Sequence, residues 1–181
     1  ATYTPRGRDG QPPCPGRTEY KDGENGTRNG AYWIPAEVDV SIRPGWFYHK
    51  KEDRKVRTPD NLMKLYFESV GRGASFLLNL PPDRRGQIHE NDAASLLAFG
   101  RRLKATFGTD LAAGAAVSAA NTRGNDEAYA PSRINDGDRN TYWCTDDTVT
   151  ATDLTLDLGK AVTFDVASLR EYLPLGLRVD D

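Results

Sequence analysis

Polar and apolar side chains alternate in the segment AEVDVSIRPGWFYH, residues 36 to 49. Glu37, Asp39, Ser41 and Arg43 fall at every second position of this segment. In a β-strand these four side chains share one face, because successive side chains point to opposite sides. Burying an unpaired carboxylate is costly, so this face either meets water or serves a site that uses acids. In a partly dry surround, a carboxyl group can act as a general acid or base.

Aromatic residues flank this strand and are candidates for that surround. Trp33 precedes it, and Trp46 and Tyr48 follow it directly. The pattern alone also fits a simpler interpretation, in which the strand is a solvated edge where Asp39 pairs with Arg43. The aromatic side chains would then pack in the core or at its rim. Both interpretations stay open at the level of the pattern.

The elements around the strand follow a regular order. Thr58 and Pro59 have the residue types of a helix N-cap and first helical position, and apolar residues then recur at helical spacing. The short apolar run 74–80 predicts a strand buried on both faces, and a second helix is expected over 92–107. Strand, helix, strand and helix in this order predict a parallel α/β fold.

The composition of the chain changes near residue 108. Residues 108–116 are small and polar and predict a linker. Residues 117–181 contain short β-like runs between Asp, Asn and Gly turns, a pattern typical of an antiparallel β-sandwich. Residues 1–31 are rich in turn formers and predict a long irregular loop at the start of the first region, 1–107.

The overall composition excludes several classes of partner. The chain has 181 residues and a formal charge of −2, which gives no reason to expect nucleic acid or an anionic membrane. No apolar run approaches the length of a membrane span. Cys14 and Cys144, far apart in the sequence, are a weak basis for a disulfide or a metal site. The chain starts without Met or a signal segment, so we expect it to be a piece of a longer protein.

Two long motifs carry a family resemblance. The segments WIPAEVDVSIRPGWFYH and LYFESVGRGASFLLNLPPDRRGQIHENDAASLLAFGRRL are similar to the C-terminal part of the catalytic barrel of α-L-fucosidases, glycoside hydrolase family 29. The likeness covers about residues 24–107. Residues 112–179 resemble the discoidin-like β-sandwich that often follows such barrels, with INDGDRNTYWCTDD as the most distinctive phrase. One departure is LGLRV, where the family would have LGQRV.

The resemblance implies a fold and a reaction. The fold class would be α/β: the C-terminal portion of a (β/α)8 TIM barrel, followed by the N-terminal part of an antiparallel sandwich. The reaction would be exo-acting, retaining hydrolysis of terminal α-L-fucosyl linkages, with no cofactor for catalysis. The W-x-P-x-E segment implies Glu37 as the acid/base. The Asp nucleophile and the histidines of the sugar site would lie outside this chain, so that the chain alone would be inactive.

The same resemblance suggests roles for the aromatic residues and for the chain's partners. Trp33, Trp46 and Tyr48 would bind the substrate by stacking on the sugar ring and burying the fucose methyl group. The partner would be a fucosylated oligosaccharide or glycoconjugate, and the protein would be secreted or periplasmic. A non-catalytic carbohydrate-binding protein, with a binding sandwich and a scaffold barrel, is the alternative function. The intact Glu37 motif favours the enzyme.

A turn in the second region gathers oxygen-bearing side chains. Asp136, Asp138 and Thr141 lie within six residues, and hard oxygen ligands in a short loop suit a structural calcium ion. The alternative is an Asx turn that needs no ion. The turn lacks the spacing of an EF-hand, and the sequence leaves both interpretations open.

Overall fold

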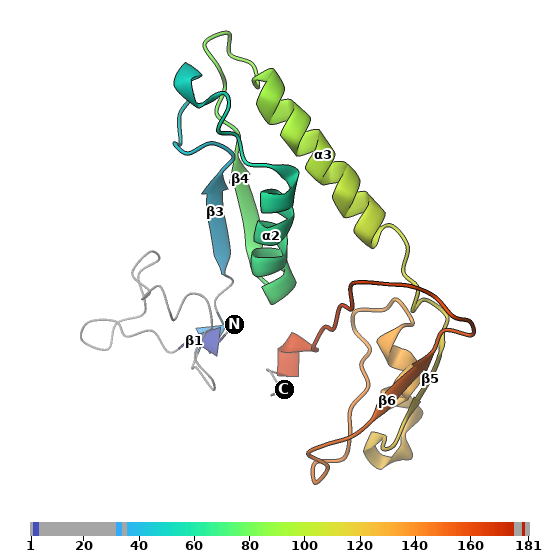
Figure 1. The fold of residues 1–181 in the computed structure, drawn as a ribbon. Coiled ribbons are helices and arrows are strands. Elements are labelled where there is room, and N and C mark those ends of the chain that lie inside the picture. Colours follow the sequence, from blue (N-terminus) through green and yellow to red (C-terminus); the bar gives the residue numbers. More distant parts are fainter. Residues whose placement is uncertain (1, 4–31, 34–35, 176–178, 180–181) are drawn as a thin grey trace, which may run out of the picture. The chain divides into compact units, whose positions relative to one another are not determined.

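The computed structural model describes residues 2–3, 32–33, 36–175 and 179. The chain forms two compact units, residues 1–105 and 106–181, which are treated separately below (Figure 1). Most of the predicted loop over 1–31 lies outside the described residues. The described part includes a short strand β1 (Thr2–Tyr3), which pairs antiparallel with β2 (Tyr32–Trp33).

The first unit is organised around two parallel strands. Strand β3 (Glu37–Ser41) pairs in parallel with β4 (Ser75–Asn79), and the register sets Glu37 beside Ser75 and Ser41 beside Asn79. The connection between them holds helix α2 (Pro59–Ser69) and two short 3-10 helices, η2 (Lys50–Glu52) and η3 (Val70–Arg72). The predicted parallel pair with a helical crossover is therefore confirmed for this part of the chain.

Local sequence signals determine both ends of α2. The Thr58 side chain accepts a hydrogen bond from the backbone N–H of Asn61 at 3.2 Å, and Pro59 occupies the first helical position. After η3 the chain turns at Gly73, whose φ of +80° suits glycine and few other residues. The predicted start of this helix is confirmed.

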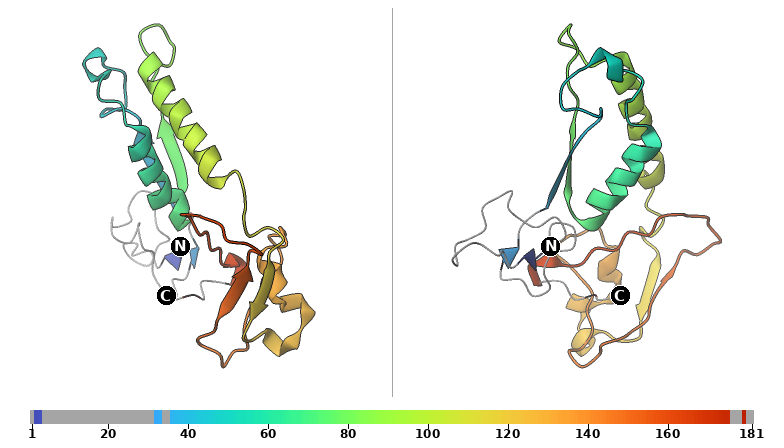
Figure 2. Two further views of the ribbon diagram at one scale, coloured as in Figure 1. Left: turned by 45° about the vertical axis from the view of Figure 1, so that its right-hand side comes forward. Right: turned by 60° about the vertical axis from the view of Figure 1, so that its left-hand side comes forward.

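The helices cover one face of the strand pair. Helix α3 (Glu90–Phe107) begins two residues before the predicted start, and α2 and α3 lie on the same side of β3 and β4 (Figure 2). The fully buried apolar core consists of Ile42, Leu62 and Phe99. Partly buried apolar residues surround it: Val56, Met63, Leu65, Tyr66, Phe76, Leu78, Leu80, Leu96 and Leu103.

The opposite face of β3 and β4 is open in the described chain. Glu37, Asp39 and Ser75 are exposed, and Leu77 keeps 51% of its surface accessible. The prediction that 74–80 is buried on both faces is therefore wrong for the described residues, because only the Phe76 and Leu78 face meets a helix layer. The helices account for one layer of the fold only.

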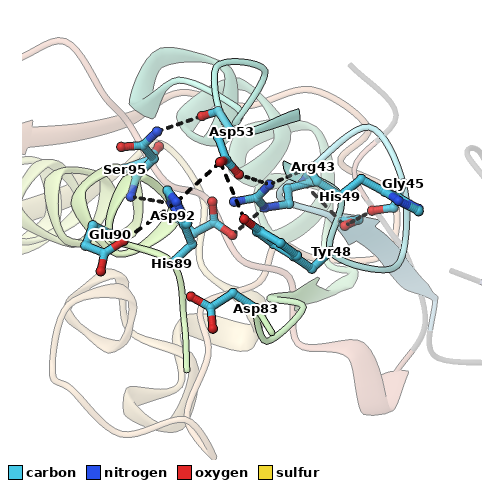
Figure 3. Close-up of polar contacts among 12 residues, drawn as sticks. Arg43, Gly45, Tyr48, His49, Asp53, Asp83, His89, Glu90, Asp92 and Ser95 are labelled. Carbon is cyan, nitrogen blue, oxygen red and sulfur yellow. Dashed lines mark hydrogen bonds and ion pairs between the residues drawn. The ribbon is translucent and has the colours of Figure 1, made fainter. Parts of the chain in front are cut away.

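A buried arginine follows the end of β3. Arg43 is 1% exposed; its Nε donates to Asp92 Oδ2 at 2.7 Å and its Nη1 donates to Asp53 Oδ1 at 3.0 Å (Figure 3). Asp92 is 0% exposed and lies in the first turn of α3. The predicted solvated pair between Asp39 and Arg43 is therefore wrong. Arg43 points to the helix side, where two acids from distant segments share its charge.

The second unit contains one antiparallel strand pair. Strand β5 (Ala116–Ala119) pairs with β6 (Leu154–Asp157). The remaining regular elements are 3-10 helices: η4 (Arg123–Asn125), η5 (Glu127–Tyr129), η6 (Pro131–Ile134) and η7 (Leu173–Leu175). The antiparallel pairing fits a sandwich, but the described residues of this unit form a single two-stranded sheet.

Among the described residues, no helix has both the length and the apolar composition that crossing a membrane requires.

We expect Asp92→Asn to lower the free energy of unfolding by about 3 kcal/mol. Removing the charge of one partner weakens a buried ion pair strongly, and the buried Arg43 would keep only Asp53, which is partly exposed, as an anionic partner. Urea denaturation would measure the change. The matched control is Asp60→Asn, which removes an exposed pair between α2 and Arg102 of α3 and should cost less than about 1 kcal/mol. Equal losses in the two variants would contradict a special role for the buried pair.

Candidate substrate-binding cleft

A cleft lies beyond the carboxyl ends of β3 and β4. Its volume is about 350 Å³, and it is lined by Trp46, Phe47, Tyr48, Asn79, Pro81, Pro82, Asp83 and Arg84. Trp46 and Phe47 are 51% and 78% exposed, which is unusual for side chains so large. Ligands of α/β folds bind outside the carboxyl ends of parallel strands. The cleft therefore occupies the position where such a fold places its site.

Hydrogen bonds from the strand ends hold the segment that carries the aromatic side chains. The Ser41 hydroxyl donates to the Gly45 carbonyl at 2.8 Å. The Asn79 amide donates to Ser41 Oγ at 3.1 Å and to the Trp46 carbonyl at 3.0 Å. Ser41 and Asn79 are register partners in β3 and β4. The strand pairing itself therefore fixes the backbone beneath Trp46.

Tyr48 joins this cleft to the buried arginine. The guanidinium carbon of Arg43 lies 4.7 Å from the centre of the Tyr48 ring, within cation–π range. The His89 ring stacks on Tyr48 at a centroid distance of 5.9 Å (Figure 3). Burial and the nearby Asp53 carboxylate raise the pKa of Tyr48, so its phenol stays protonated at neutral pH. Tyr48 is thus a rigid part of the cleft wall.

The other wall contains the carboxylate of Asp83, which is bound by Arg85. Arg85 donates from Nε and Nη2 to Asp83 Oδ2, at 2.9 and 2.6 Å, and its backbone N–H donates to Oδ1 at 2.7 Å. Hydrogen bonds from the Arg85 side chain lower the pKa of Asp83 to about 2. Backbone N–H groups also lower this pKa, and burial acts in the opposite direction. A general acid needs a pKa near the working pH. Asp83 is therefore ionised at neutral pH and paired with Arg85, a state that does not suit a general acid.

The structure does not bring Glu37 to this cleft. Glu37 is the first residue of β3 and is exposed, whereas Trp46 follows the last residue, Ser41. Four strand steps separate Glu37 from Ser41, or about 13 Å at 3.3 Å per residue. This position argues against the implied acid/base role, because catalytic groups of such folds lie at the carboxyl ends of strands.

Of the three aromatic residues predicted to bind substrate, two line the cleft. Trp46 and Tyr48 line one cleft, as expected for residues that act together. Trp33 lies in β2, where its backbone pairs with Thr2, and its side chain is outside the described part of the structure.

Sequence reasoning missed six of the residues that line the cleft: Phe47, Asn79, Pro81, Pro82, Asp83 and Arg84. Their signal was positional: segments that follow two parallel strands meet at one edge of a sheet.

The predicted calcium turn is held by its own side chains. Asp136 Oδ1 accepts the backbone N–H of Asp138 at 2.9 Å, and Asp138 Oδ1 accepts that of Asn140 at 2.9 Å, as in Asx turns. Thr141 Oγ lies 2.8 Å from Asp136 Oδ2 and 3.1 Å from the Asp138 carbonyl oxygen. Within the described ranges, no three His, Cys, Asp or Glu side chains gather as for a metal ion. Hydroxyl and carbonyl oxygens are the further ligands that calcium would need here.

The cleft can bind a ring that has both apolar and polar edges. Trp46 and Phe47 offer exposed aromatic surface, and Pro82 adds a flat apolar face. Asn79 and Arg84 contribute polar groups at the same cleft. Pyranose rings present this mixture of C–H faces and hydroxyl edges, so a sugar is the class of ligand that the surface suits.

Comparisons with known proteins agree with this choice. The sequence model of the family described as Alpha-L-fucosidase matches residues 8–106. Alpha-L-fucosidase 1 of Arabidopsis thaliana is 35% identical over 165 residues, which is 91% of this chain and 32% of that protein. The chain thus spans about a third of the length of the curated relatives it matches.

Solved structures give the same result. A GH29 fucosidase of Ruminococcus gnavus, determined in complex with fucose, is 36% identical and superposes with a TM-score of 0.68, over 75% of this chain and 27% of that one. The structure of SpGH29 is 34% identical, with a TM-score of 0.72 over 80% of this chain and 31% of that one. The family match covers more than half of the chain. The chain therefore belongs to the alpha-L-fucosidase family.

Proposed function

We propose that the chain is part of an exo-acting, retaining α-L-fucosidase that removes terminal α-L-fucosyl residues from glycans. The observation that carries the proposal is the aromatic cleft at the carboxyl ends of β3 and β4, in a segment matched by the fucosidase family model. The relative from Ruminococcus gnavus binds fucose. A secreted or periplasmic location stays a prediction.

In this proposal β3 and β4 are neighbouring strands of a TIM barrel. Their helix-covered face is the outer face, and the open face of Glu37, Asp39 and Leu77 turns toward the barrel interior. Layers of side chains from other strands fill such an interior. The longer protein would supply those strands, which explains why this face is uncovered in the described chain.

The retaining reaction requires two carboxyl groups about 5 Å apart, one as nucleophile and one as acid/base. Among the described lining residues of the cleft, Asp83 is the one acid, and Arg85 occupies it. We infer that the nucleophile and the sugar-binding histidines come from outside this chain. The contribution of this chain is to bind and orient the substrate.

Trp46→Ala should reduce kcat/KM of the full-length enzyme for an aryl α-L-fucoside by about 10- to 100-fold. Burying a large aromatic or aliphatic surface against the ligand is worth about 1.5–3 kcal/mol, and each 1.4 kcal/mol is tenfold. Phe164→Ala, an exposed aromatic of the second unit, is the control and should change little. NMR of the first product would show retained anomeric configuration in the wild type. No turnover of any fucoside by the wild type would refute the enzyme and favour a binding protein.

Glu37→Gln separates the role implied by the family resemblance from the role that the geometry supports. From the position of Glu37 at the amino end of β3, we expect kcat/KM to stay within a few-fold of wild type on natural and aryl fucosides. Loss of an acid/base group would instead cost about 10²–10⁴-fold on natural glycans, with milder loss on aryl fucosides and partial rescue by azide. That second result would restore Glu37 as the acid/base.

We further propose that Asp136, Asp138 and Thr141 can hold a structural calcium ion in the second unit. The close approach of the Thr141 hydroxyl, the Asp136 carboxylate and the Asp138 carbonyl oxygen supports it, because calcium takes side-chain and backbone oxygens together. The melting temperature should then rise with free calcium, with a stabilisation of about 2.7 kcal/mol at a hundredfold excess over Kd.

The calcium dependence has its own controls. Asp136→Ala should abolish it, whereas Asp153→Ala, on an exposed segment before β6, should keep it. Turnover should not change directly on chelation. Identical melting curves in calcium and in chelator would leave the Asx turn as the complete account.

A further inference from the structure

We propose that Arg84 forms a subsite for a carboxylate on the sugar next to the fucosyl residue, so that the enzyme favours acidic fucosylated glycans. This inference rests on the proposed fucosidase function and deepens it by naming a substrate class. It concerns the part of the substrate that leaves, not the fucose.

Arg84 is the cleft's uncompensated charge. It lines the cleft and is exposed, and the structure gives it no hydrogen-bond or ion-pair partner among the residues it describes. The adjacent Arg85, in contrast, is fully engaged, because its Nη2 lies 2.6 Å from Asp83 Oδ2 and 2.7 Å from Glu90 Oε1. Arg85 thus binds carboxylates of the protein, whereas the neighbouring Arg84 is available to bind a ligand.

The pairing of the charged groups favours an anion at Arg84. Asp83 and Arg84 are the charged residues among those that line the cleft. Arg85 binds the Asp83 carboxylate from outside the lining set and shares its guanidinium with Glu90. The guanidinium of Arg84 has no such partner among the described residues and is exposed to water that an anionic ligand group can replace.

The chemistry beside Arg84 narrows the ligand to an acidic sugar. A guanidinium presents N–H groups as a planar fork that matches the two oxygens of a carboxylate. Trp46 and Phe47 line the same cleft and offer exposed aromatic faces to the ring that would carry this carboxylate. A simple inorganic anion would use the fork but not the aromatic surface. The combined surface therefore fits a carboxylate attached to a pyranose ring.

A pair of disaccharides provides the cleanest test. One is α-L-fucosyl-galactose, and the other is α-L-fucosyl-galacturonate with the same linkage, which replaces one CH₂OH group by a carboxylate. The full-length enzyme would be assayed on both, and on an aryl α-L-fucoside, at low and high salt. Variants would be Arg84→Gln, Arg84→Lys and, as a control for net charge, Arg101→Gln on the exposed surface of α3.

We expect Arg84→Gln to lower kcat/KM about fivefold on the acidic disaccharide and less than twofold on the neutral disaccharide and aryl fucoside. An exposed ion pair is worth up to about 1 kcal/mol, which is about fivefold, and salt weakens it. Arg84→Lys should recover part of the loss, and Arg101→Gln should change none of the three substrates. High salt should remove the wild-type preference.

Two results would overturn the inference while leaving the enzyme intact. One is equal loss on the acidic and neutral disaccharides in Arg84→Gln, and the other is the same acid preference in Arg84→Gln as in wild type. Failure of the wild type to hydrolyse the aryl fucoside as well as both disaccharides would instead refute the proposed function itself. The aryl fucoside thus distinguishes the two failures.

Discussion

The buried guanidinium of Arg43 is the constraint on which the first unit depends. A charge that is 1% exposed must be balanced inside the protein, and Asp53 and Asp92 balance it from two other segments. The pairs tie the end of β3 to the start of α3 and to the connection before α2. Among the described residues, Nη2 of Arg43 and Oδ1 of Asp92 are buried and have no hydrogen-bond partner, so the contact between these two residues is a single hydrogen bond.

This network has a direct consequence for the cleft. Tyr48 packs over the guanidinium, and Trp46 is held by the amide of Asn79. Tyr48 therefore cannot move away without uncovering a buried charge, and the neutral Asn79 amide fixes the backbone of Trp46. Rigid support of this kind favours a binding surface that is formed before the ligand arrives. The aromatic cleft lies at the carboxyl ends of the strands, and Glu37 lies at the opposite end of β3.

The elements with local signals and the parallel strand pair could be predicted from the sequence, and the long-range pairings between side chains could not. Thr58, Pro59 and Gly73 fix α2 through bonds and dihedral preferences within a few residues. The alternation from Glu37 to Arg43 predicted a strand, but the chain leaves β3 at Ser41, so Arg43 no longer follows the strand pattern. Its partner Asp92 is 49 residues away. Polar spacing in sequence cannot identify such a partner, and the pairing with Asp39, one of the two interpretations that the pattern left open, is not the one that forms.

The most direct measurement is a crystal structure of the full-length protein with a non-hydrolysed fucosylated oligosaccharide. The account predicts that the sugar lies beyond the carboxyl ends of β3 and β4, with a pyranose ring in contact with Trp46 or Phe47. It also predicts that Glu37 makes no contact with the ligand. A ligand bound at the amino ends of the strands, beside Glu37 and away from Trp46, would contradict the account.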